Sequence, residues 1–131
     1  MSIKEEYGLK YYEDDFRTSL TTWYNKLLDK SYLELDIGDV IRMLRQNILP
    51  YMALNKAIDL FLENPYAGDI EEGEILSLLL NHENLPNNRI GEIIEALERV
   101  KSGYLNYSWI EEDEKNLFIQ NVASLLDKLS I

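Results

Sequence analysis

The sequence predicts an all-α protein, a single compact bundle of about six helices over residues 1–131. Apolar residues recur at three- and four-residue intervals through almost the whole chain, which is the spacing of one face of an α-helix. The alternating pattern of a β-strand is nearly absent. Three prolines and six glycines leave few places where a helix must end. A chain of this length suits one domain, which buries about two-thirds of its unfolded surface without needing disulfides or metals.

Residues that start or stop helices divide the chain into its expected elements. Helices are predicted over about 16–29, 36–49, 51–63, 69–80, 89–101 and 110–129. Asp36 is an expected N-cap, because its carboxylate can accept a hydrogen bond from a free amide of the first turn. Pro50 interrupts the next stretch, since its ring lacks the N–H and clashes one turn back. The turn NPYAG at 64–68 ends a helix, and Asp69 is expected to cap the following one with Glu72 completing a capping box.

Hydrophobicity differs strongly between residues 69–80 and residues 1–14. The predicted helix at 69–80 is apolar around most of its circumference, which is typical of a helix buried at the centre of a domain. Residues 1–14 are polar with three tyrosines, and we expect them to be partly disordered.

Charge is the strongest global signal in the sequence. The chain has 24 acidic and 13 basic residues, a net charge of −11. The excess is uneven: residues 1–65 carry a net charge of −3 and residues 66–131 a net charge of −8. This balance argues against nucleic acid and anionic membranes as partners, because both are bound through basic surfaces. An acidic surface favours a basic protein partner and speeds its encounter, although charge can also serve solubility alone.

Three features bear on the cellular location. The chain has no cysteine, which is typical of a reducing compartment and leaves no disulfide, thiolate metal site or thiol nucleophile. The first residues, MSIKEEYGLKYY, lack the apolar stretch of a signal peptide. The longest apolar runs are far shorter than the ~20 residues that a bilayer requires. We therefore expect a cytoplasmic protein.

Catalytic motifs are missing from the sequence. The single histidine, His82, sits in a polar loop, where a solvated side chain is favoured over a general base. No nucleophile elbow, phosphate-binding loop or H-E-x-x-H motif occurs. The acids at 69–74 lack the register of a calcium loop. We expect no enzyme activity, no cofactor and no metal; hydrolysis by an acid pair is a remote alternative.

Two acidic helix starts and one aromatic turn are the candidate partner-binding features. DIEEGE at 69–74 and EEDE at 111–114 each hold four acids, whereas the helix dipole accounts for only one or two. Tyrosine and tryptophan are enriched in interface hot spots, so the turn before the second acidic run could anchor a partner. The alternative is that its aromatics fill the gap between the last two helices. The predicted partner-binding residues are Glu71, Glu72, Glu74, Tyr104, Tyr107, Trp109, Glu111, Glu112, Asp113 and Glu114.

One block, residues 39–79, resembles the shared region of immunity proteins from bacterial contact-dependent growth inhibition systems. In that family an Asp precedes an Arg-x-Leu-Arg-Gln helix, and a helix with a central Ala, an Asn/Asp-Pro turn and a Gly-Glu helix start follow. The matching positions are Asp39, Arg42, Leu44, Arg45, Gln46, Asn47, Ala57, Pro65, Gly68, Asp69, Gly73, Glu74 and Leu76. The chain departs from the pattern at Ile70-Glu71-Glu72, where the family has an aromatic residue. We expect most of the matching residues to serve the fold, with Asp39 and Arg42 close enough on one helix to pair.

The resemblance implies a small cytoplasmic helical protein that binds one cognate toxin and blocks it. The implied partner is the C-terminal toxin domain of a large secreted protein, commonly a nuclease and often one acting on RNA. A nuclease is basic around its cleft, so an acidic inhibitor fits by steric and electrostatic occlusion. The alternative is a helical adaptor or regulator that binds a peptide or signalling protein through a groove.

Overall fold

The computed structural model describes residues 1–13, 19–68, 73–82 and 84–129, and these residues form helices and no strand. The all-α prediction is therefore confirmed. The α-helices are α1 (Ile3–Tyr7), α2 (Ser19–Leu28), α3 (Ile37–Arg45), α4 (Pro50–Glu63), α5 (Glu74–Asn81), α6 (Ile90–Gly103) and α7 (Glu112–Leu129). Three short 3₁₀-helices join them: η1 (Tyr32–Glu34), η2 (Asn87–Arg89) and η3 (Tyr104–Asn106).

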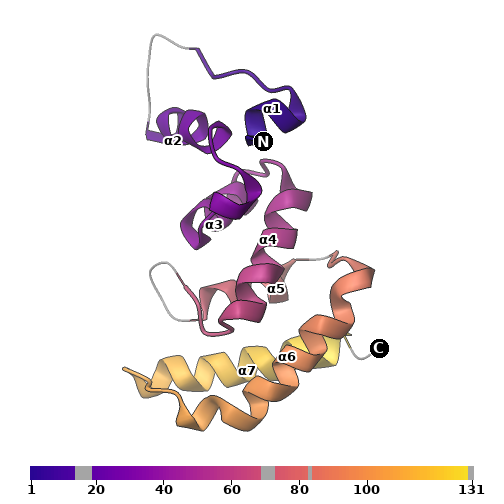
Figure 1. The fold of residues 1–131 in the computed structure, drawn as a ribbon. Helices are drawn as coiled ribbons and strands as arrows, with labels where there is room; N and C mark the ends of the chain where they lie inside the picture. The colour runs from indigo at the N-terminus through magenta and orange to yellow at the C-terminus, as the bar shows by residue number, and fades with distance from the viewer. Residues whose placement is uncertain (14–18, 69–72, 83, 130–131) are drawn as a thin grey trace.

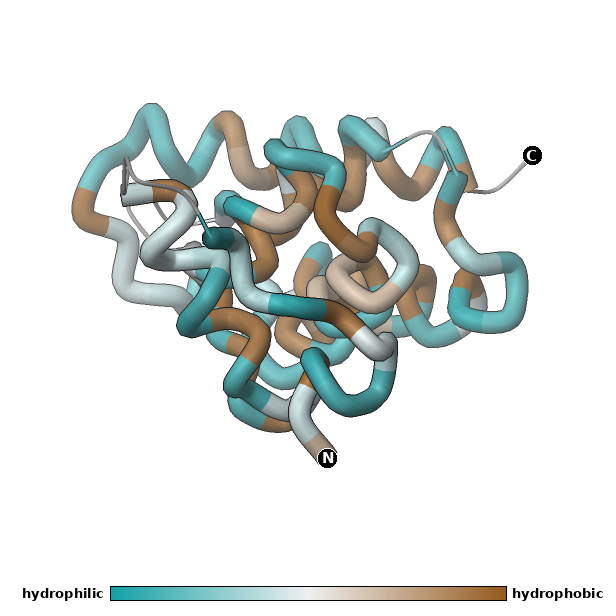
Figure 2. The backbone as a smooth tube through the Cα atoms, turned by 90° about the horizontal axis from the view of Figure 1, so that it is seen from above, coloured by the Kyte–Doolittle hydropathy of each residue, from teal (hydrophilic) through white to brown (hydrophobic). Residues whose placement is uncertain are grey.

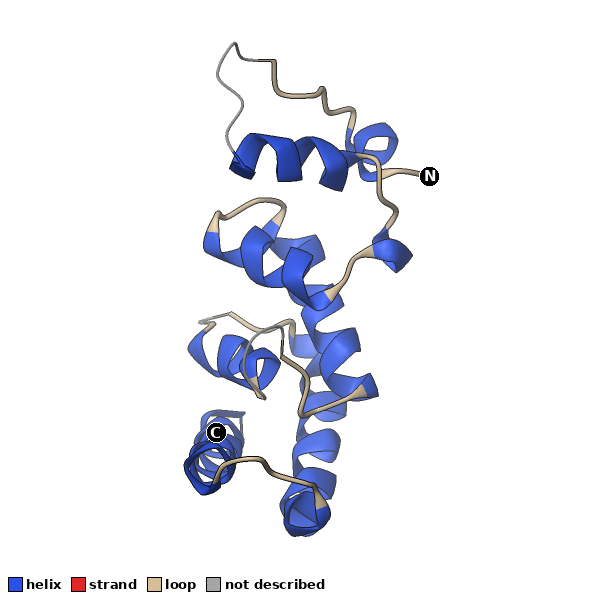
Figure 3. Ribbon diagram, turned by 90° about the vertical axis from the view of Figure 1, so that its left-hand side faces the viewer, coloured by secondary structure: helices blue, strands red, loops and turns tan. Residues whose placement is uncertain are grey.

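The helices stack in layers, with α1 and α2 at one end of the molecule and α6 and α7 at the other (Figures 1 and 3). The central helix α4 packs against α3, α5 and α6 and so connects the layers. Helices α5 and α6 both pack against α7, the longest helix. Among the described residues, no helix combines the length and the apolar character needed to cross a membrane.

The buried apolar side chains form two clusters, and Figure 2 shows how apolar and polar segments alternate along the chain. The larger cluster has members from every helix from α3 through α7 and includes the fully buried Phe61, Leu76 and Leu97. The smaller cluster holds the N-terminal layer in place. Its buried members are Ile3, Leu27, Leu28, Leu35, Met43, Met52 and Ala53. Helices α3 and α4 contribute to both clusters, so the two ends of the stack share a continuous framework.

Local sequence signals at α3 and α4 act as predicted. Asp36 caps α3 by accepting a hydrogen bond from the amide of Asp39, and the two residues complete a capping box. Pro50 is the first residue of α4, where its missing N–H costs nothing. The predicted central position of α5 is also correct, because Ile75, Leu76 and Leu79 are fully buried.

The start of α5 differs from the prediction. The helix begins at Glu74, and its N-cap is Gly73 rather than Asp69. Gly73 has a φ of 80°, a left-handed conformation that breaks the helix on its N-terminal side. Asp69 and Glu72, the two residues of the expected capping box, lie outside the described ranges.

The N-terminal segment contains a helix that the sequence analysis missed. Ser2 and Glu5 form a capping box at the start of α1, and Gly8 ends it in the left-handed conformation. Ile3 is fully buried, and its amide donates to the carbonyl of Lys30 at 2.8 Å. This part of the segment expected to be partly disordered is therefore docked on the smaller cluster.

Candidate functional site

The motif residue Asp39 joins two layers of the fold. Asp39 is only 5% exposed, and its carboxylate accepts hydrogen bonds from the Trp23 indole at 3.0 Å and the Lys30 ammonium at 2.6 Å. Burial alone would raise the pKa of Asp39, but the bonds from Lys30 and Trp23 outweigh it and hold this pKa below its ordinary value. The ion pair expected with Arg42 is replaced by the pair with Lys30, and Arg42 instead lies over the Trp23 ring at 5.3 Å.

The motif glycine Gly73 permits a close contact between α5 and α7. Its amide donates to the carbonyl of Tyr66 at 2.8 Å, which closes the turn after α4. A Cβ atom at this position would lie 2.9 Å from Cδ2 of Phe118, closer than side chains tolerate. Glycine is therefore required here for its backbone conformation and for its size.

The aromatic turn before α7 packs against Tyr66, which follows α4, and against Phe118 of α7. The rings of Tyr66 and Tyr107 stack with centroids 4.0 Å apart, and Trp109 lies 4.8 Å from Tyr107 and 5.2 Å from Phe118. The Trp109 indole donates to the carbonyl of Tyr104 at 2.8 Å. All these rings except the buried Phe118 are half-buried, so they do fill the gap beside α7. Their role as partner anchors stays a prediction.

The starts of α5 and α7 lie at the same end of the molecule, because Gly73 packs against Phe118 in the second turn of α7 (Figure 1). At the start of α7, Glu111, Glu112 and Asp113 are exposed and Glu114 is half-buried. Lys115 offsets part of this charge through an ion pair with Glu112 at 2.5 Å. Across from them, Glu74 is half-buried at the start of α5, and Glu71 and Glu72 fall outside the described residues.

Helix α6 adds an acidic face that the sequence analysis did not single out. Glu92, Glu95 and Glu98 are exposed at intervals of three residues, alongside the exposed Arg99 and Lys101. The E-x-x-E-x-x-E spacing could have predicted this face, since residues three apart lie on one side of a helix. The helix leads directly into η3 and the turn before α7, so Glu98 lies closer along the chain to that end than Glu92 does.

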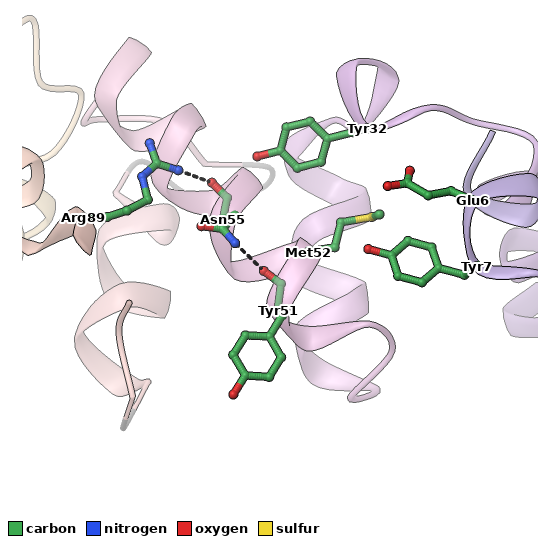
Figure 4. A pocket seen from close by; sticks show the side chains of 7 residues that line it. All are labelled: Glu6, Tyr7, Tyr32, Tyr51, Met52, Asn55 and Arg89. Carbon is green, nitrogen blue, oxygen red and sulfur yellow. Dashed lines mark hydrogen bonds between the residues drawn. The ribbon is translucent and has the colours of Figure 1, made fainter. Parts of the chain in front are cut away.

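An open pocket of about 400 Å³ lies at the other end of α6 (Figure 4). We call it the tyrosine pocket, and it is lined by Glu6, Tyr7, Tyr32, Tyr51, Met52, Asn55 and Arg89. These residues come from α1, η1, α4 and η2, elements that are far apart in the sequence. No local motif could therefore have indicated it.

A network of polar contacts fixes one wall of the tyrosine pocket. Arg89 donates to the carbonyl of Asn55 at 3.1 Å and forms ion pairs with Asp59 at 2.6 Å and Glu92 at 3.0 Å. The Tyr32 hydroxyl donates to Asp59 at 2.5 Å. Burial, followed by this bond to Asp59, raises the pKa of Tyr32 well above its ordinary value, so the phenol stays protonated.

The class of protein follows from the comparison with known families. Residues 5–100 match the family of CDI immunity proteins, and the chain belongs to this family of contact-dependent growth inhibition immunity proteins. The match contains the whole block 39–79 and extends beyond it on both sides, whereas α7 lies outside it. No curated protein and no solved structure matches the chain. Proteins of this family bind a toxin to neutralise it and are in general not enzymes.

Proposed function

We propose that the protein neutralises a nuclease toxin, and a ribonuclease before other nucleases, by steric and electrostatic occlusion. The toxin would be the basic C-terminal domain of a large secreted protein of the same inhibition system. Family membership supports the toxin partner, and the charge of this chain supports the basic domain. Occlusion requires no chemistry from the inhibitor itself.

The observation that supports this proposal is that Glu74 at the start of α5 and the acids at the start of α7 lie at one end of the fold, where Gly73 packs against Phe118. We define the acidic face as the exposed or half-buried acids of this end and of α6. Its members are Glu74, Glu92, Glu95, Glu98, Glu111, Glu112, Asp113 and Glu114. A nuclease concentrates positive charge where it holds phosphates, so carboxylates can occupy the same positions. The carboxylates must be held in fixed positions to take the places of phosphates. The packed rings of Tyr107 and Trp109 support the turn that leads into α7.

The remaining predicted contacts fit around this face. Glu71 and Glu72 immediately precede the start of α5, so we propose that they extend the acidic face toward the toxin. Tyr104, Tyr107 and Trp109 would contribute mainly by holding the turn before α7, with their exposed edges meeting the partner.

The experiment combines co-purification with a nuclease assay. The toxin domain encoded beside this gene is purified with and without the protein, and RNA cleavage is followed in both samples. The double variant Glu111→Lys/Asp113→Lys should weaken inhibition by tenfold or more, since reversed charges repel a basic partner. The order of magnitude follows from about 1.4 kcal/mol per tenfold change in affinity.

A matched variant separates the acidic face from overall charge. Glu13→Lys/Asp127→Lys makes the same change in net charge at two exposed acids outside the acidic face. It should leave inhibition nearly intact. Equal losses in both double variants, or none in the first, would show that the acidic face is not the contact surface, and circular dichroism checks that each variant is folded.

A further inference from the structure

We propose that the tyrosine pocket receives one arginine or lysine side chain of the toxin. This inference rests on the proposed function, because the side chain belongs to the basic partner described above. It assigns a recognition role to residues of the N-terminal layer and α4, away from the acidic start of α7.

The rings of the pocket suit a cation. Tyr51 is 82% exposed and Tyr7 46% exposed, so both offer ring surface to a partner, and Tyr32 lies on the opposite side of Met52 from Tyr51 (Figure 4). A cation over an aromatic face is attracted by the ring quadrupole when it lies within about 6 Å. The chain already uses such contacts internally, as Lys56 lies 5.0 Å from the centroid of the Tyr32 ring.

The charges around the pocket also favour a cation. Within the described ranges the carboxylate of Glu6 has no ion pair, and it faces the pocket beside Tyr7 (Figure 4). Arg89 is already paired with two carboxylates, those of Asp59 and Glu92. Three carboxylates, those of Glu6, Asp59 and Glu92, therefore lie at or next to the pocket. The basic side chains there are Arg89 and Lys56. An incoming cation therefore finds the carboxylate of Glu6, whereas an incoming anion finds Arg89 already held by two acids and Lys56 buried over the Tyr32 ring.

One neutral acceptor completes the recognition surface. The Asn55 amide nitrogen donates to the carbonyl of Tyr51 at 3.1 Å, which fixes the side chain. Its oxygen then points away from that bond and can accept a hydrogen bond from a guanidinium or ammonium group. A purely apolar side chain would leave this oxygen and the Glu6 carboxylate without partners.

The pocket is positioned for a protein that lies on the acidic face. Arg89 of the pocket pairs with Glu92, the first acid of α6 and a member of that face, so the two surfaces adjoin at the start of α6. The wall formed by α1 is held in place by Ile3, which is fully buried. A partner lying along α6 can therefore reach the pocket without a change in fold.

The test measures the affinity of the purified toxin domain for the full-length protein by isothermal titration calorimetry. Tyr51→Ala and Glu6→Gln should each weaken binding by about tenfold, the range of a desolvated cation–aromatic or charge contact. The matched controls are Tyr12→Ala, an exposed tyrosine outside the pocket, and Asp127→Asn, an exposed acid on α7. Both controls should change affinity less than twofold.

A double-mutant cycle then identifies the occupant. Each arginine and lysine of the toxin domain is replaced by alanine, and binding is measured against wild type and Glu6→Gln. For one basic residue, replacement by alanine should weaken binding at least about fivefold less in the Glu6→Gln background than in the wild-type background. If Tyr51→Ala weakens binding but no basic residue of the toxin is coupled to Glu6, the occupant of the pocket is a side chain other than arginine or lysine.

The outcomes separate this inference from the function on which it rests. Absence of binding by the wild-type protein would overturn the proposed function together with the pocket. Tight binding that survives both pocket variants unchanged would overturn the pocket alone. Because Tyr51 and Glu6 are exposed, both variants should unfold at the wild-type temperature, and a shift in that temperature identifies any variant that is misfolded.

Discussion

At the residue scale, Asp39 shows how a charged side chain can stabilise a fold from within. A buried carboxylate is costly unless donors replace the water that it loses. Here the indole of Trp23, the ammonium of Lys30 and the amide of Asp36 take that place. The N-terminal layer is thus attached to α3 by directed polar bonds as well as by apolar packing.

We predict that Asp39→Asn lowers the free energy of unfolding by about 1–3 kcal/mol at pH 7. The variant keeps the size of the side chain but removes the 2.6 Å ion pair of Lys30, which keeps only its longer pair with Asp36 at 3.9 Å. Urea unfolding followed by circular dichroism measures the change, with Asp127→Asn as the control for loss of one exposed negative charge. An unchanged unfolding midpoint would mean that the buried pair does not stabilise the fold.

The pH dependence gives this interaction a second signature. The pKa of Asp39 is lowered in the folded state, so its contribution is complete above the ordinary pKa and is lost as pH falls through the folded value. The pKa of Lys30 is raised by its bond to Asp39, so the Lys30 contribution is lost only in strongly basic solution. The stability difference between wild type and Asp39→Asn should therefore shrink as pH falls from about 7 to about 3. A difference that stays constant over this range would contradict the assigned ion pair.

The two halves of this network differ in how far the sequence could predict them. The cap from Asp36 to the amide of Asp39 joins residues three apart, and local chemistry was enough to predict it. Lys30 and Trp23 lie nine and sixteen residues from Asp39, and no local rule selects them over Arg42. Arg42 shares a helix face with Asp39, yet the tertiary fold gives the carboxylate a closer and more buried partner.

At the element scale, the long helices were predictable and their starts were less so. Apolar spacing predicted α2 to α7, because each buries one face against a neighbour. The five residues of α1 give too short a pattern to be recognised, and the helix depends on the docking of Ile3. Acidic residues predicted a start for α5 at Asp69, whereas the left-handed Gly73 sets the start at Glu74.

We predict that Gly73→Ala lowers the free energy of unfolding by about 2–4 kcal/mol. Alanine must adopt a left-handed conformation there, and its Cβ must displace the ring of Phe118, which packs α5 on α7. The matched control is Gly91→Ala in α6, where nothing lies within 4 Å of the new Cβ. That control should stabilise the protein by up to about 1 kcal/mol, since alanine is the better helix former. Thermal unfolding of both variants measures the contrast, and equal effects would refute the assigned close contact.

At the scale of the whole molecule, the sequence predicted where negative charge accumulates but not how it is distributed in space. The acids of 111–114 are adjacent in the chain, so they were visible without a structure. The approach of α5 to α7 depends on packing around Phe118, and the tyrosine pocket depends on four separate elements. Surfaces assembled by tertiary structure carry no local signature, and for that reason both were missing from the sequence analysis.

The same charge makes a prediction about kinetics that concerns the molecule as a whole. A net charge of −11 should steer a basic toxin domain during its approach, and salt screens that attraction. We predict that the association rate falls at least about tenfold between roughly 0.05 and 0.5 M salt, while the dissociation rate changes much less. Stopped-flow fluorescence at increasing salt measures both rates. The variant Glu111→Gln/Asp113→Asn should show a shallower salt dependence than Glu13→Gln/Asp127→Asn, because its removed charges lie on the acidic face. An association rate that is indifferent to salt would instead indicate an apolar groove binder, the adaptor that the sequence left as the alternative.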